Sequence, residues 1–266
     1  MKKHGFTKYN LFNFLLFTFY FFICTFARKN QDKKDMRIGI IVAMSVEFAQ
    51  LVRLMQESRR EHMGGLDFTV GRIGRHEVVL LQCGIGKVNA AMGATLLTEH
   101  FRPGCIISTG CAGGIDKRLA VMDIVVSSEL VYHDVDCGAG LGCAKGQVQG
   151  LPLRFTADPS LVAAATALSG PVCIHAGLIC TGDQFITSHE TLARIKADFP
   201  DGLAVDMESA AIAQVCHVLG VPFVSFRIIS DTPGADGHQQ QYENFWQQMA
   251  DRSFGVTKEF LSKIEK

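Results

Sequence analysis

Short apolar runs alternate with amphipathic segments along the chain from Met36 onward. The runs have the length of buried strands, and the segments between them have the spacing of helices with one apolar face. This alternation predicts an α/β fold, with helices in layers on both faces of a central mixed β-sheet. The predicted strands cover residues 37–44, 66–73, 76–83, 105–110, 123–136, 175–183 and 221–231.

The helices predicted between these strands cover residues 45–55, 84–101, 158–170 and 206–220, and a last helix covers residues 238–266. Ser45 is the expected N-cap of the first helix, because a serine hydroxyl can accept a hydrogen bond from a free N–H of the first turn. Gly220, with Pro222 just beyond it, is expected to end the fourth helix. Residues 111–116 read as a turn, and residues 137–152 as a long glycine-rich loop.

The first 35 residues differ from the rest, since they are rich in phenylalanine and poor in alanine and glycine. Three interpretations fit this leader. Lys2, Lys3 and Lys8 before the apolar run 11–27 suggest a signal peptide cleaved after Ala27. The same run could be an uncleaved membrane anchor, although it is short for a span. Met36 could also be the true start, and residues 36–266 are expected to form one domain in every case.

Composition narrows the kinds of partner. A chain of 266 residues with 48% hydrophobic and 20% charged residues can bury a large core. The formal net charge is zero and the basic residues form no long block, so a nucleic-acid partner is not expected. The 9 cysteines show no metal-binding spacing and read as reduced thiols, and a Cys137–Cys143 disulfide would need an oxidising compartment. A small-molecule site without metal or cofactor is expected.

Polar residues follow several of the predicted strands, at the ends where α/β sheets bind ligands. The residues after strands are Glu47, Cys111 to Gly114, Asp183, Phe185, Ile186 and Asp231, and Met207 and Glu208 accompany the start of the acidic helix. The GIGK segment at residues 84–87 lacks the remainder of a phosphate-binding P-loop, so a nucleoside triphosphate is not expected. His133 is expected to be a structural histidine with its hydrogen bonds satisfied.

A series of segments carries a family resemblance: IGIIVAMSVEFAQLV, GIGKVNAAMGATLL, STGCAGGI, DIVVSSELVYHDVD, TGDQFI, AVDMESAAIAQVCHVLGVPF and RIISD, in this order. Together they closely resemble the 5′-methylthioadenosine/S-adenosylhomocysteine nucleosidases of the purine nucleoside phosphorylase-like superfamily. The resemblance covers residues 36–266. It implies hydrolysis of the N-glycosidic bond of methylthioadenosine and S-adenosylhomocysteine, which releases adenine in methionine salvage and recycling.

The resemblance assigns Asp231 as the acid that protonates adenine N7, and Glu47 as the base that activates water. Adenine leaves poorly as an anion, which is why the reaction needs an acid. A free aspartate, with an ordinary pKa of about 3.9, is ionised at neutral pH. The apolar run before Asp231 is expected to favour its protonated form, or else the proton arrives with the substrate.

The same resemblance assigns the binding residues. Glu208 matches the residue that binds the ribose hydroxyls, and Met207 matches an apolar contact with the sugar. Phe185 is expected to stack on adenine while the Ile186 backbone hydrogen-bonds its edge. The remaining expected site residues are Ala112, Gly113, Arg227, Ser230 and Tyr242.

Two departures from the family pattern concern specificity. Cys111 stands where relatives commonly have serine, so a hydroxyl hydrogen bond is lost. The loop after Asp136 lacks the aromatic residue that relatives place in the thioalkyl pocket of the neighbouring subunit of a homodimer, and Leu141 is the nearest replacement. The preferred 5′ substituent therefore stays open.

Three other functions remain as alternatives. A phosphate-dependent nucleoside phosphorylase would need an arginine in the first-strand loop, which here reads MSVEF. An aminofutalosine nucleosidase would use the same residues as those assigned above. A non-catalytic nucleoside-binding surface protein would suit an exported chain. The family points to a cytoplasmic homodimer if Met36 is the start, and to an exported or anchored protein if residues 1–27 are real.

Overall fold

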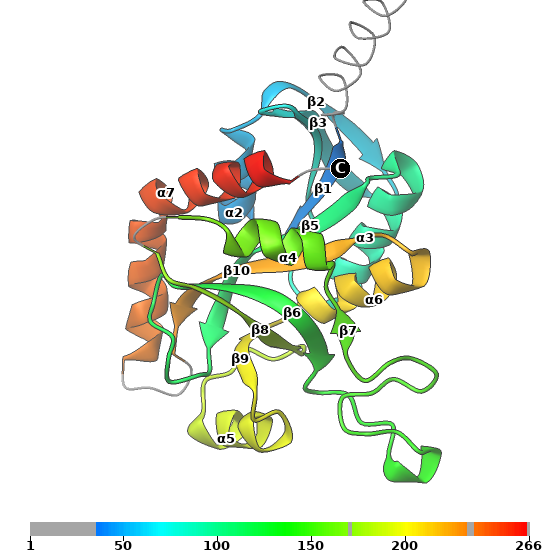
Figure 1. Ribbon diagram of the computed structural model, residues 1–266, viewed down its shortest axis with the longest axis vertical. Coiled ribbons are helices and arrows are strands. Elements are labelled where there is room, and N and C mark those ends of the chain that lie inside the picture. The colour runs from blue at the N-terminus through cyan, green and yellow to red at the C-terminus, as the bar shows by residue number, and fades with distance from the viewer. Residues whose placement is uncertain (1–35, 170–171, 233–236, 265–266) are drawn as a thin grey trace, which may run out of the picture. The chain divides into compact units, whose positions relative to one another are not determined.

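A mixed β-sheet forms the centre of the part described in our computed structural model, residues 36–169, 172–232 and 237–264 (Figure 1). Parallel and antiparallel pairings both occur, as the sequence predicted. The strands are β1 (Arg37–Val42), β2 (Gln56–Met63), β3 (Leu66–Ile73), β4 (His76–Gln82), β5 (Cys105–Gly114), β6 (Ile124–Tyr132), β7 (Phe155–Thr156), β8 (Ile174–Thr181), β9 (Gly202–Asp206) and β10 (Phe223–Asp231).

Part of the sheet closes on itself. The strands β10, β6, β8, β9 and β5 are neighbours in this order, and β10 also pairs with β5, which completes a ring. From β5 the sheet continues outward through β1, β4, β3 and β2. The local pattern of the sequence did not predict this closure, because it depends on pairings between strands that are distant in the chain.

Helices cover both faces of the sheet, which confirms the layered α/β architecture (Figure 1). Helices α2 (Ser45–Val52) and α4 (Pro159–Thr166) both contact α7 (His238–Lys263). On the other face, α3 (Lys87–Phe101) packs against α6 (Ser209–Leu219). The short helix α5 (His189–Asp198) lies beyond β9, and a 3₁₀ turn covers Ala139–Leu141. No helix in the described ranges is long and apolar enough to cross a bilayer.

Separate apolar clusters fill the space between the sheet and its two helix layers. One cluster joins Leu97 of α3 and Ile212 of α6 to the sheet. The other joins Leu161 of α4 and Phe260 of α7 to the opposite face. Strand residues buried on both sides explain why β1 and β10 appear in the sequence as nearly unbroken apolar runs.

Several predicted boundaries are wrong. Helix α2 begins at Ser45, so its N-cap is Met44 rather than Ser45. Strand β5 continues to Gly114, through the residues predicted as a turn. Helix α6 begins at Ser209, because residues 202–206 form the short strand β9. Gly220 has the left-handed conformation expected at the end of this helix.

Several elements have no counterpart in the prediction, among them β2, β9 and α5. Strand β2 is a largely exposed edge strand of polar residues, so it lacks an apolar signature. Strand β9 has only 5 residues, all buried. Helix α5 is short and mostly polar, and the Ser188 side chain caps it by accepting a hydrogen bond from Thr191 N–H. The predicted leader, residues 1–35, lies outside the described residues.

Candidate active site

A cavity of about 650 Å³, including its open mouth, contains the residues predicted for the site. Every predicted site residue lines it: Glu47, Ala112, Gly113, Phe185, Ile186, Met207, Glu208, Arg227, Ser230, Asp231 and Tyr242. The positions are therefore those expected, and the roles of these residues stay predictions.

The ring of strands explains why these residues meet. Strands β1, β5 and β10 run parallel to one another, and β8 and β9 run parallel to each other. Strand β9 meets β5 in the opposite direction, and the two pair only at their carboxyl ends, Gly113 with Val205 and Gly114 with Ala204. The carboxyl ends of both groups therefore border the same cavity.

Glu47 is a buried carboxylate in the first turn of α2. Its Oε2 accepts hydrogen bonds from the N–H groups of Ala43, at 3.1 Å, and Met44, at 3.0 Å. Its Oε1 accepts a hydrogen bond from Cys111 N–H at 3.1 Å. These backbone donors hold the side chain in one orientation at the cavity wall.

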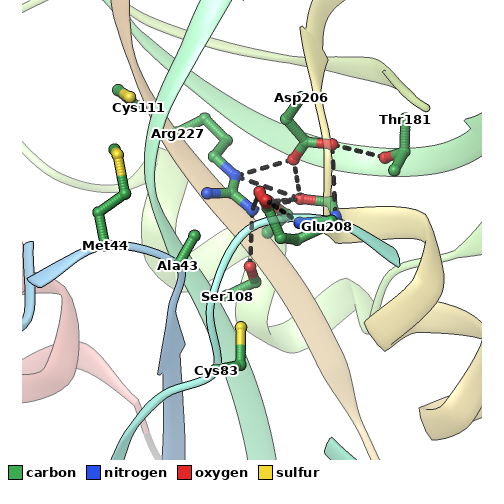
Figure 2. Close-up of polar contacts among 12 residues, drawn as sticks. Ala43, Met44, Cys83, Ser108, Cys111, Thr181, Asp206, Glu208 and Arg227 are labelled. Atoms are coloured by element: carbon green, nitrogen blue, oxygen red, sulfur yellow. Dashed lines mark hydrogen bonds and ion pairs between the residues drawn. The ribbon is translucent and has the colours of Figure 1, made fainter. Parts of the chain in front are cut away.

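Arg227 is buried at the centre of a network that joins β10, β9 and β5 (Figure 2). Its Nε lies 2.9 Å from Asp206 Oδ2, and its Nη2 donates to Ser108 Oγ at 2.9 Å. The Ser209 hydroxyl bonds to Asp206 and accepts from Arg227. Asp206 also accepts from Thr181 Oγ1 at 2.6 Å. The Arg227 guanidinium held in this way stays charged and well oriented.

Glu208 lies beside this network, just before α6. Its Oε1 accepts a hydrogen bond from Gly86 N–H at 3.0 Å, and its Oε2 lies 3.7 Å from Arg227 Nη2. Both neighbours hold the carboxylate at the cavity edge, where it can accept hydrogen bonds from ligand hydroxyl groups.

A β-bulge lies at the end of β10, beside Asp231. Ile229 pairs with Ala112 and Asp231 pairs with Gly113, so Ser230 is the extra residue on β10. Successive strand residues normally point to opposite faces, but this irregularity allows both Ser230 and Asp231 to line the cavity. Ser230 Oγ donates to Asp231 Oδ1 at 2.5 Å, and Asp231 is buried.

The outer wall of the cavity is apolar. Phe185 and Tyr242 meet edge to face, with ring centroids 5.6 Å apart. The Tyr242 hydroxyl lies 3.9 Å from Met44 Sδ. Phe185 is 52% exposed, so its ring is available to a planar ligand. Leu141, expected as a substitute for the missing aromatic residue, is exposed at 58% and is not part of the cavity wall within this chain.

Burial sets the protonation of the glutamates. It raises the pKa of Glu47 above the ordinary value, even though Arg227 and the backbone donors act to lower it. Burial also raises the pKa of Glu208, against the lowering effect of Arg227. Desolvation disfavours the charged form of a carboxyl group, so both residues take up a proton more readily than an exposed glutamate.

Cys111 makes a backbone hydrogen bond to Glu47, but its side chain is a thiol where a serine would have a hydroxyl. Its N–H donates to Glu47, as any residue there could. Burial, and then the nearby Glu47 carboxylate, raise the pKa of its thiol well above the ordinary range. The thiol is therefore neutral, and every cysteine in the described part is free.

The sequence did not single out several cavity residues. Asp206 is the most important, because it is the closest charged partner of Arg227. Its position directly before Met207 and Glu208 was the available signal. Ala43, Met44, Ile85, Gln184 and Val205 also line the cavity. His133 is buried, and its Nε2 has no hydrogen-bond partner among the described residues, so its role as a structural histidine stays a prediction. Within the described ranges, no group of His, Cys, Asp and Glu residues could hold a metal ion.

Known proteins share this sequence and fold. The chain matches the phosphorylase superfamily over residues 37–262. A 5′-methylthioadenosine/S-adenosylhomocysteine nucleosidase of Actinobacillus succinogenes is 44% identical over 233 residues, which cover 86% of this chain and 100% of that protein. The chain belongs to this nucleosidase family, within the phosphorylase superfamily. A nucleosidase of Geobacillus kaustophilus is also 44% identical, over 86% of this chain and 98% of its own length.

Solved structures of nucleosidases confirm the fold. The enzyme of Colwellia psychrerythraea, in complex with adenine, superimposes with a TM-score of 0.82 at 38% identity and covers 87% of this chain and 97% of its own. The enzyme of Neisseria meningitidis, in complex with methylthio-immucillin-A, has a TM-score of 0.82 at 36% identity, over 86% of this chain and 100% of its own.

Proposed function

We propose that this protein hydrolyses the N-glycosidic bond of 5′-methylthioadenosine and S-adenosylhomocysteine, releasing adenine and the corresponding thioribose. The observation that carries the proposal is the meeting of Glu47, Glu208 and Asp231 in one cavity with an aromatic wall. Two relatives that are 44% identical are named for this activity. The structure of another relative was solved in complex with adenine.

Asp231 is the proposed general acid. As the bond between C1′ and N9 breaks, its proton passes to adenine N7, so adenine leaves as a neutral molecule. The sugar then has the character of an oxocarbenium ion. Ser230, whose hydroxyl donates to Asp231, is the proposed support for this side chain.

Glu47 is the proposed general base. A water molecule attacks C1′, its oxygen forms the new bond, and one of its protons passes to Glu47. The carboxylate already accepts backbone hydrogen bonds on both oxygens, so its orientation toward the water needs no rearrangement. Arg227, a buried cation near it, favours the ionised form that a base requires.

The remaining cavity residues bind substrate in this proposal. Glu208 accepts hydrogen bonds from the ribose hydroxyls, and Met207 contacts the sugar. Phe185 stacks on adenine, and the Ile186 backbone bonds its edge. Ala112 and Gly113 allow close approach of the backbone, and Tyr242 covers the 5′ substituent beside Met44.

Hydrolysis is preferred to phosphorolysis on electrostatic grounds. A phosphate ion near the water position would face the Glu47 carboxylate, and the nearest arginine, Arg227, already pairs with Asp206. Aminofutalosine hydrolysis would use the same acid and base, so it remains the alternative within enzymes. A protein that only binds nucleosides would not need both carboxylates.

We also infer a homodimer. The apolar side chains of Ile85, Val88 and Met92 are exposed at the start of α3. A second subunit that covered them would lie next to the cavity, because Ile85 lines it. Light scattering after gel filtration tests this assembly, and a monomer at micromolar concentration would refute it.

The location in the cell depends on the true start of the chain. We infer a cytoplasmic enzyme if translation begins at Met36, and an exported or anchored one if residues 1–27 are translated. Mass spectrometry of the native N-terminus distinguishes initiation at Met36, cleavage after Ala27 and retention of the leader.

Adenine release tests the function directly. The full chain and a chain of residues 36–266 are each incubated with methylthioadenosine, with and without phosphate, and adenine is measured by chromatography. We expect equal release without phosphate, and Asp231→Asn is expected to lower turnover at least 1,000-fold, on the order of 4 kcal/mol, while a substrate analogue still binds. Release that requires phosphate would contradict hydrolysis, and full turnover in the variant would contradict the acid. A panel of 5′-substituted adenosines and aminofutalosine identifies the substrate.

A further inference from the structure

The GIGK segment at residues 84–87 forms an ion pair with Asp134, two residues beyond the end of β6. Lys87 Nζ lies 2.8 Å from both carboxylate oxygens of Asp134. The two side chains are only 22% and 16% exposed. Lys87 Nζ also lies 5.3 Å from the centre of the Tyr132 ring. Partial burial strengthens such a pair relative to one in water.

A third residue closes the arrangement. The Asp183 carboxylate accepts a hydrogen bond from Lys87 N–H at 2.8 Å, and Asp183 N–H donates to Asp134 Oδ2 at 2.9 Å. Each of these three residues therefore contacts the other two. We call Lys87, Asp134 and Asp183 the loop clasp. They come from the start of α3, the segment after β6 and the segment after β8.

The neighbouring glycines allow this close approach. Gly86 has a φ of +97°, and a Cβ atom there would lie 3.0 Å from Asp183 Oδ1. A Cβ atom at Gly182 would overlap the His133 ring and crowd Asp134. A side chain at either position would push apart the segments that the clasp joins.

The segment that leads into α3 and the segment after β8 each form or support part of the cavity wall. Gly86, directly before Lys87, donates its N–H to Glu208 Oε1. Asp183 precedes Gln184, Phe185 and Ile186, which line the cavity. The three clasp residues do not themselves line it, so any effect on the ligand must pass through their neighbours.

We propose that Lys87, Asp134 and Asp183 are positioning residues, which hold the ribose-binding Glu208 and the adenine-binding segment 184–186 at a constant separation. The proposal rests on the proposed function for the identity of the substrate. Without the clasp, the two segments move independently, and binding the nucleoside has to order both of them.

The electrostatics of Asp134 agree with this role. Burial alone would raise its pKa, but the hydrogen bonds from Lys87 and from Asp183 N–H lower it below the ordinary value. The carboxylate is thus ionised throughout the neutral range, and the ion pair is intact wherever the enzyme would work.

Substitutions in the full chain test the clasp. Lys87→Met removes the charge while keeping a long side chain, and Lys87→Arg restores the charge. Lys145→Met is the matched control, because Lys145 pairs with Asp136 at 3.4 Å on the exposed loop nearby and does not line the cavity. Asp183→Ala is a second test variant whose parent side chain is 46% exposed and so tolerates replacement.

We expect Lys87→Met to raise KM for methylthioadenosine at least about tenfold and to lower kcat less than about fivefold, because the clasp orders binding groups rather than the acid or the base. Lys87→Arg is expected to return KM to within about threefold of the parent, and Lys145→Met to leave both constants unchanged. Asp183→Ala should act in the same direction as Lys87→Met.

Hydrogen exchange of the ligand-free protein gives a readout that needs no turnover. In Lys87→Met we expect faster exchange in residues 83–87 and in residues 182–186 together, with the sheet unchanged. A KM within twofold of the parent, or faster exchange confined to residues 83–87, would overturn the clasp. A parent chain that releases no adenine would refute the proposed function instead, while the exchange result would still decide the clasp.

Discussion

At the scale of single residues, Gly110 determines whether Glu47 and Arg227 can both occupy the site. A Cβ atom at this position would lie 2.5 Å from Glu47 Oε1 and 2.8 Å from Arg227 Nη1. Its φ of +146° is also unfavourable for other residues. The absence of a side chain therefore leaves the space in which the proposed base sits.

We predict that Gly110→Ala lowers kcat/KM at least about 100-fold and the free energy of unfolding by about 2 kcal/mol, because the methyl group displaces Glu47 and strains the backbone. Kinetics and urea denaturation measure the two effects. Gly74→Ala is the control, since Gly74 also has a positive φ but a Cβ atom there would meet no other atom within 4 Å. It should lose about 1 kcal/mol of stability with kcat/KM unchanged. Equal activity losses in both variants would contradict the steric explanation.

The raised pKa values of Glu47 and Glu208 predict opposite effects of pH on activity and stability. A general base must be ionised, so kcat/KM should fall as pH decreases through a value above the ordinary 4.5 of a glutamate. The folded state binds these protons more tightly than the unfolded chain, so the same groups contribute less stability as pH rises through that range.

Glu208→Gln separates the two effects. We compare the free energy of unfolding of this variant with that of the parent at each pH. The difference should shift in favour of the variant by about 1 kcal/mol as pH rises from about 5 to about 8, because a buried carboxylate that must ionise is replaced by a neutral amide. Its KM should rise. Chemical denaturation at each pH provides the measurement, and a variant that loses stability relative to the parent as pH rises would contradict the raised pKa.

At the scale of secondary-structure elements, the site depends on the buried Arg227, which joins β10 to β9 through an ion pair with Asp206 and to β5 through a hydrogen bond to Ser108. Asp206 ends β9, Arg227 lies within β10, and Ser108 lies within β5. The side chains of Asp206 and Arg227 are 1% and 2% exposed. Removing one partner of a buried ion pair leaves the other charge poorly compensated. The stability lost in this way is larger than the stability that an exposed ion pair contributes.

Asp206→Asn is therefore predicted to lower the free energy of unfolding by about 3 kcal/mol. Asp201→Asn is the comparison, because Asp201 pairs with Arg154 on the surface, and its loss should cost less than about 1 kcal/mol. Urea denaturation decides this, and equal losses in the two single variants would show that burial is unimportant here.

At the scale of the whole molecule, the layered α/β fold followed from the sequence, whereas the closed ring of strands did not. The apolar runs of β1, β4 and β10 were long enough to predict as strands. The five residues of β9 were not, although this strand closes the ring between β8 and β5. The edge strand β2 was missed because it is polar and largely exposed, so its sequence shows no alternation of apolar and polar residues.

The sequence by itself determined most of the local structure and the residue types of the site: strands from apolar runs, helices from their spacing, and Glu47 and Asp231 after predicted strands. Family resemblance added their proposed roles. Only the tertiary structure decided that Asp206 pairs with Arg227, that a bulge turns Ser230 and Asp231 into one cavity, and that Lys87 meets Asp134 and Asp183. The reason is physical: periodicity reports which face of an element is buried, while contacts between distant segments depend on how the strands pair and close.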